Sequence, residues 1–260
     1  MQSVSPKRGY LDRGIKMKYQ GEIEFRVRNF PQEFDAFDVF IGKDDVQKIK
    51  ISSQDDVLIL KCVVAFEGIE RVEEIDKKCK IYCEGTVGKL ACFFEEAFSE
   101  VSFEVGNLVD QNGESFIYKP KRMVLRRVVG TFSLHAPVDQ KKLVKFVNDS
   151  GLDKDNYCEL FSFILKFDND VQKFLFLYNM LLEFSGDKQP RVDEKIRNVY
   201  PDVSMSISEH TNKPETIYTR LRNEVGHKRS DASYMRTIGG ISSNILKFQN
   251  IVKKIIFKME

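Results

Sequence analysis

The feature that most constrains this chain is a change in the spacing of its apolar residues near Pro137. Before that proline, apolar residues recur mainly at every second position, which is typical of half-buried β-strands. After it they recur at steps of three and four, which places them on one side of α-helices. We therefore expect an α+β protein with a β-rich N-terminal domain followed by a C-terminal α-helical bundle.

The β-rich domain is expected to span residues 18–137, behind an N-terminal tail at 1–17. The turn-forming sequence Asp110–Gly113 is expected to join two of its strands. Residues 70–98 have a less regular pattern, and a helix is predicted there around Phe93–Phe98. Strands are predicted for residues 19–30, 57–66, 101–105 and 123–134.

The second domain is expected to span residues 138–260 and to be a bundle of about four helices. Asp168–Asp170 is expected either to interrupt the long segment 157–184 or to cap a second helix within it. Pro214 is at a position that favours a helix start. Helices are predicted at 141–147, 157–184, 192–199, from Pro214 onward, and at 234–258.

Composition excludes several classes of protein. An apolar fraction of 42% and a charged fraction of 31% are typical of a globular chain and not of a disordered one. The longest strongly apolar run, Phe174–Leu182, is about half as long as a membrane span. The basic N-terminus has no apolar segment behind it, so we expect no secretory signal and a cytoplasmic location.

The five cysteines are an odd number in a chain without an export signal, so reduced thiols are expected. Cys79 and Cys83 have a spacing compatible with a shared metal ion, but no histidine is near them in the sequence. Cys92 is the only other thiol close by. Buried thiols are the simpler interpretation, and we predict neither a metal nor a cofactor.

Residues 218–229 include several side chains of the types that take part in catalysis. On a helix of about 100° per residue, Ile217, Leu221 and Val225 form an apolar stripe, and the neighbouring polar side chains point away from it. An arginine cation for phosphate, an imidazole that moves protons near neutral pH and an amide that orients them are the groups that RNA cleavage requires. The candidate catalytic residues are Arg222, Asn223 and His227.

The sequence Arg222-Asn-Glu-Val-Gly-His227 resembles the R-x4-6-H motif of HEPN domains, including the polar residue after the arginine. That resemblance implies a small helical bundle that acts as a homodimer. It also implies a metal-independent ribonuclease, a hydrolase of toxin–antitoxin or antiviral defence systems. Arg222 and His227 of two subunits would line one cleft, where the ribose 2′-hydroxyl attacks the adjacent phosphate. The segment is also similar, more weakly, to methylamine-utilisation MauJ-like proteins.

The distribution of charged residues along the chain agrees with an RNA partner. Residues 191–260 carry 13 basic and 8 acidic residues, whereas the rest of the chain carries 28 and 31. Arg220, Lys228 and Arg229 are the predicted RNA-binding residues, and an antitoxin or sensor partner is a further expectation. Two alternatives stay open: a non-catalytic dimerisation or binding module, and a solvated helix face on which Arg222 and Glu224 form surface pairs.

Overall fold

The computed structural model describes residues 17–43, 45–119, 138–149, 152–208, 212–226 and 233–257. The chain is α+β, as predicted, with a six-stranded antiparallel sheet in its N-terminal part and helices after it. It divides into a sheet unit, residues 1–83 and 100–137, and a helical unit, residues 84–99 and 138–260. The predicted strand at 123–134 lies outside the described residues.

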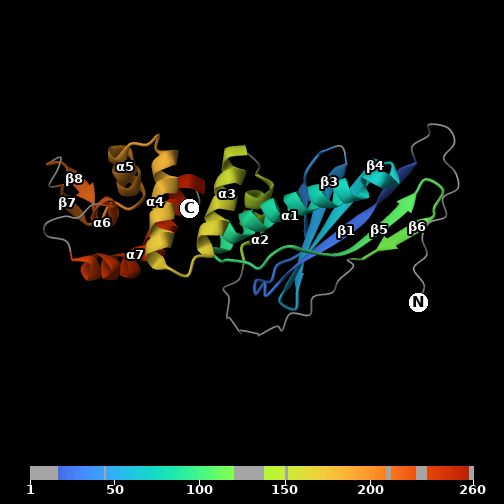
Figure 1. Ribbon diagram of the computed structural model, residues 1–260, viewed down its shortest axis with the longest axis horizontal. Coiled ribbons are helices and arrows are strands. Elements are labelled where there is room, and N and C mark those ends of the chain that lie inside the picture. The colour runs from blue at the N-terminus through green and yellow to red at the C-terminus, as the bar shows by residue number, and fades with distance from the viewer. Residues whose placement is uncertain are drawn as a thin grey trace. The chain divides into compact units, whose positions relative to one another are not determined.

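The sheet has the strand order β2-β3-β4-β1-β5-β6, and every neighbouring pair is antiparallel (Figure 1). The predicted turn at Asp110–Gly113 is confirmed, because it joins β5 to β6. Three strands of the sheet, β2, β3 and β6, were not predicted. The strands are β1 (Lys18–Arg28), β2 (Phe37–Phe40), β3 (Val46–Gln54), β4 (Val57–Glu67), β5 (Ser102–Asp110) and β6 (Ser115–Tyr118).

The period-2 pattern of β1 gives the sheet two different faces. Ile23, Phe25 and Val27 are almost completely buried, whereas the alternating charged residues are half-buried or exposed. The first half of helix α1 (Val72–Phe94) packs on the buried face, where the Sγ of Cys62 in β4 lies 3.5 Å from that of Cys83. The opposite face of the sheet carries the charged side chains.

Helix α1 differs from the prediction in length and in place. A helix was expected only around residues 93–98, but α1 has 23 residues and ends at Phe94. Its second half belongs to the helical unit, although the sequence pattern put residues 84–99 in the β-rich domain. Hydrogen bonds hold this half of the helix to the helical unit, because Lys89 donates to the carbonyl of Val147 and Cys92 to the carbonyl of Cys158.

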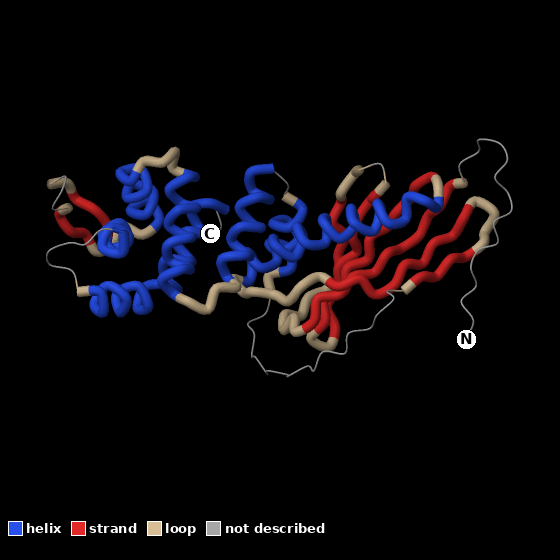
Figure 2. The backbone as a smooth tube through the Cα atoms, in the orientation of Figure 1, coloured by secondary structure: helices blue, strands red, loops and turns tan. Residues whose placement is uncertain are grey.

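The helical unit contains more helices than the four expected, together with a small hairpin (Figure 2). Asn169 caps α4 by accepting the N–H of Gln172, as the sequence suggested. The core of this unit centres on Phe248, whose ring stacks on that of Tyr218 at 4.6 Å. Its elements are α2 (Gln140–Asn148), α3 (Leu152–Leu165), α4 (Asp170–Phe184), α5 (Gln189–Val199), β7 (Met205–Ile207), β8 (Pro214–Thr216), α6 (Ile217–Gly226) and α7 (Tyr234–Phe257).

All five cysteines are buried and free. Cys79 and Cys83 both lie under the sheet, next to Cys62. The neighbouring Cys62 thiol and burial raise the pKa of Cys79, which makes a thiolate unfavourable there. Within the described residues, no group of three or more His, Cys, Asp or Glu side chains is arranged to hold a metal ion.

Candidate functional site

Helix α6, which carries the motif, begins at Ile217 and not at Pro214. Pro214 instead opens β8, which pairs with β7. The helix is capped by Thr216, whose Oγ1 accepts the backbone N–H of Thr219 at 3.3 Å. The hairpin therefore sets the first turn of the helix, and with it the direction of every motif side chain.

The buried side of α6 differs from the expected stripe. Ile217 and Val225 are only half-buried, whereas Tyr218 and Thr219 are buried together with Leu221. Relative to Ile217, Arg222 falls at about 140°, between Tyr218 at about 100° and Thr219 at about 200°. Arg222 therefore faces the body of the unit, and its guanidinium carbon lies 6.0 Å from the centre of the Tyr178 ring. The prediction that Arg222 points away from the core was wrong.

A buried network anchors the start of α6 to α5. Asp193 is 6% exposed, and its Oδ1 accepts the hydroxyls of Thr216 and Thr219, each at 2.7 Å, and the N–H of Thr216. Since the Thr219 proton points to Asp193, the Tyr178 hydroxyl donates to Thr219 at 2.9 Å. The carboxylate also lies at the positive end of the α6 dipole. The burial of Tyr178 raises its pKa, so its hydroxyl keeps its proton.

The amide of Asn223 is held on both sides. Its Oδ1 accepts from Gln189 Nε2 at 3.0 Å and from Arg222 Nη1 at 3.2 Å. Its Nδ2 donates to Glu215 Oε2 at 3.1 Å, and Glu215 is only 4% exposed. Asn223 therefore fixes the guanidinium of Arg222. Arg222 makes no ion pair with any carboxylate in the described part of the chain.

Arg220, one turn from Glu224, has a different environment. Its Nε lies 2.7 Å from the Glu224 carboxylate, which is only 5% exposed and also accepts the hydroxyl of Thr237 in α7. This pair ties α6 to α7. The positive charge of Arg220 is therefore already matched, whereas that of Arg222 is not.

His227, Lys228 and Arg229 follow directly after the last residue of α6, Gly226, and lie outside the described residues. The structure therefore brings together two of the three candidate catalytic residues, Arg222 and Asn223. It adds two that the sequence pattern did not single out, Gln189 and Glu215. Neither residue is recognisable from the sequence pattern, because their hydrogen bonds join segments that are far apart along the chain.

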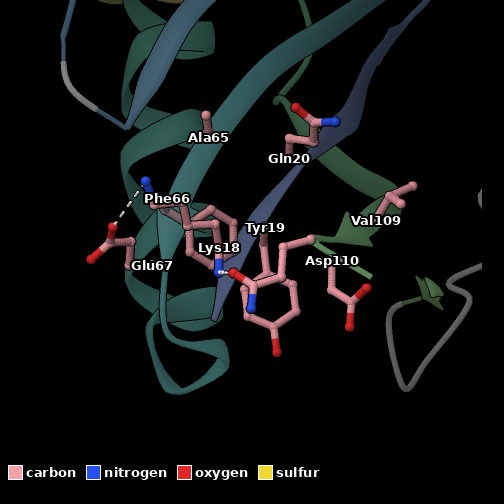
Figure 3. A pocket seen from close by; sticks show the side chains of 9 residues that line it. Lys18, Tyr19, Gln20, Ala65, Phe66, Glu67, Val109 and Asp110 are labelled. Atoms are coloured by element: carbon pink, nitrogen blue, oxygen red, sulfur yellow. Dashed lines mark hydrogen bonds and ion pairs between the residues drawn. The ribbon is translucent and has the colours of Figure 1, made fainter. Parts of the chain in front are cut away.

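A hollow of about 410 Å³ lies at one end of the sheet, beside Lys18, Tyr19 and Asp110 (Figure 3). The protein itself uses the polar groups there. Lys18 lies 3.8 Å from Glu67, and Asp110 accepts two backbone N–H groups of the turn that follows it. Burial and the nearby Asp110 raise the pKa of Tyr19. The hollow thus offers no group that is poised for chemistry.

No protein-family model matches the chain, and neither a curated protein nor a solved structure matches it. None of the described helices combines the length and the apolar character that crossing a membrane requires.

Proposed function

We propose that the helical unit is a HEPN-type endoribonuclease of the cytoplasm that cleaves RNA by 2′-hydroxyl attack without a metal ion, as a toxin or phage-defence effector. The observation that carries the proposal is the state of Arg222: a guanidinium held by a fixed amide and lacking a carboxylate partner in the described chain. Such a cation suits a phosphate, which its planar fork binds through two hydrogen bonds.

The remaining residues take roles around that cation. Asn223 positions Arg222, since its own amide is engaged by Gln189 and Glu215. His227, five residues after Arg222, supplies the imidazole that moves the proton of the 2′-hydroxyl. Two copies of the chain form the cleft as a homodimer, and Lys228 and Arg229 bind the flanking RNA. Arg220 contributes less, because it is paired with Glu224.

The test is cleavage of a mixed RNA pool in EDTA by the full chain. Arg222→Ala and His227→Ala are each expected to lower the rate at least about 100-fold, because each removes a group that acts in the transition state. Arg222→Lys should keep the charge but lose the fork, and so retain only part of the rate. Arg236→Ala is the matched control, since Arg236 is an exposed arginine of α7 in the same unit.

Two results would count against the nuclease. One is cleavage by His227→Ala at the wild-type rate, and the other is a strictly monomeric protein in light scattering, which leaves no shared cleft. The unfolding midpoints of the variants must match that of the wild type, so that a lost activity is not a lost fold.

The second candidate is a non-catalytic binding module with the same helices. The observation in its favour is that Gln189, Glu215 and Arg222 all engage the Asn223 amide, so that Asn223 serves the fold. A dimer that binds RNA or a protein partner but leaves the pool intact, with and without His227, would support this alternative.

A further inference from the structure

A second basic site lies on the other flank of α5. Arg191, Lys195 and Asn198 are spaced at i, i+4 and i+7, so they share one side of the helix. With the end of α4 they line an open pocket of about 380 Å³. Asp193, between them in sequence, points instead into the buried network with α6. The helix thus separates the pocket side chains from those that anchor α6.

The turn between α4 and α5 shapes this pocket. Gly186 has a φ of +68°, which a residue with a side chain rarely adopts, and a Cβ built there would lie 3.5 Å from Nη1 of Arg191. The guanidinium therefore lies against the turn. The Nζ of Lys195 stands 4.9 Å from the centre of the Phe184 ring. The two cations are held against the same wall of the pocket.

The charges of the pocket are not balanced by the described chain. Glu194 also lines it, but neither Arg191 nor Lys195 comes within ion-pair distance of a carboxylate in the described residues. Two like charges one turn apart on a helix repel each other. A bound anion would remove that repulsion.

The wall also contains an unused donor. The Oγ of Ser185, the residue that ends α4, is buried and has no hydrogen-bond partner among the described residues. Buried hydroxyls normally have a partner, and one without a partner calls for an explanation. Together with the amide of Asn198, the pocket then offers two cations and two neutral donors.

We propose that this pocket, built by Arg191, Lys195, Asn198 and Ser185, binds a phosphate group. A guanidinium fork, a point charge and neutral donors suit the several oxygens of a phosphate. The volume of about 380 Å³ leaves room for the group that carries it. That group is either the backbone of an RNA strand or a free nucleotide. The site lies apart from Arg222 on α6 and does not depend on the nuclease proposal.

The test compares two double variants in the full chain carrying His227→Ala, so that RNA stays intact. Arg191→Ala/Lys195→Ala removes the pocket cations, and Arg236→Ala/Lys254→Ala removes the same charge from exposed positions of α7. The probes are a labelled 12-nucleotide RNA and adenosine 5′-monophosphate. We expect the pocket variant to bind at least one probe about tenfold more weakly, and its RNA salt slope to fall by about 1.

The two probes distinguish the sources. A loss confined to RNA assigns the site to the strand backbone, whereas a loss of nucleotide binding assigns it to a free nucleotide. The proposal is overturned if the pocket variant binds both probes like its parent, or if the α7 variant loses as much. A different result would rule out the nuclease proposal: a His227→Ala variant that still cleaves RNA at the wild-type rate.

Discussion

The open face of the sheet and the surface of α5 and α6 both carry charged side chains, but several cations on α5 and α6 form no ion pair, although Arg220 pairs with Glu224. On the sheet, lysines pair with carboxylates of other strands: Lys48–Asp38 at 2.6 Å and Lys61–Glu24 at 3.6 Å between neighbouring strands, and Lys50–Glu22 at 2.7 Å across β4. On α5 and α6, the cations Arg191, Lys195 and Arg222 form no ion pair in the described part of the protein.

The difference lies in where the carboxylates point. In the helical unit, Asp193 and Glu215 are turned inward and bonded to hydroxyl, amide and backbone donors. The nearby cations Arg191, Lys195 and Arg222 are left without an acid among the described residues. We infer that cross-strand ion pairs neutralise the charges of the sheet face, whereas the unpaired cations of α5 and α6 are available to the anionic ligands proposed above.

The largest effect on stability is expected from Asp193→Ala. The change leaves two threonine hydroxyls and one N–H without their buried acceptor and should lower the free energy of unfolding by about 3 kcal/mol or more. Urea unfolding followed by circular dichroism measures this. Asp193→Asn, which keeps one acceptor oxygen, should recover part of the loss. A loss below about 1 kcal/mol would mean that the network contributes little.

A smaller effect is expected from Glu24→Ala on the sheet. Glu24 lies 2.6 Å from Arg26 and 3.6 Å from Lys61, and both cations are well exposed to solvent. Solvent screens such pairs, so the loss should stay below about 1 kcal/mol and shrink further in high salt. If Glu24→Ala costs as much as Asp193→Ala in the same urea experiment, the contrast between the two surfaces does not hold.

The smallest effect is expected from Asp45→Asn, and it depends on pH. Hydrogen bonds from Lys78 and Arg71 lower the pKa of Asp45 below its ordinary value of 3.8. The ionised form is thus favoured in the folded state. Its contribution is complete above the unfolded pKa and is lost as pH falls through the lower folded one. Asp45→Asn should therefore lower the thermal midpoint slightly at pH 7, and by less as the pH falls toward 2. An equal shift at both pH values would contradict this.

The sequence predicted the alternating strand at 19–30, the strand in the β-branched run at 57–66, and helices with regular apolar steps, such as 234–258. It did not predict α1, because that helix buries cysteines and Thr86 where larger apolar residues would give a pattern. Gly85 and Gly88 within the helix also lower its intrinsic propensity. Packing against two sets of partners, not local preference, forms this helix.

At the candidate site, the sequence located Arg222 and Asn223 but not their surroundings. An apolar stripe was assumed to define the buried side of α6, yet Thr219 is buried because Asp193 and Tyr178 take up its hydroxyl. Hydrogen bonds between distant segments leave no periodic trace in a sequence. For the same reason Gln189 and Glu215 became visible only in the structure.

The division of α1 between the units has a practical consequence for anyone who wishes to isolate the helices. A fragment cut at residue 138 would lose Phe93 and Glu95, and with them the acceptors of the Lys253 ammonium at 2.9 and 2.7 Å. The Lys253 ammonium, which belongs to a residue only 9% exposed in the full chain, would lose both of these partners in such a fragment. The helical unit is thus discontinuous in sequence, and a self-sufficient piece of it must carry its own copy of residues 84–99.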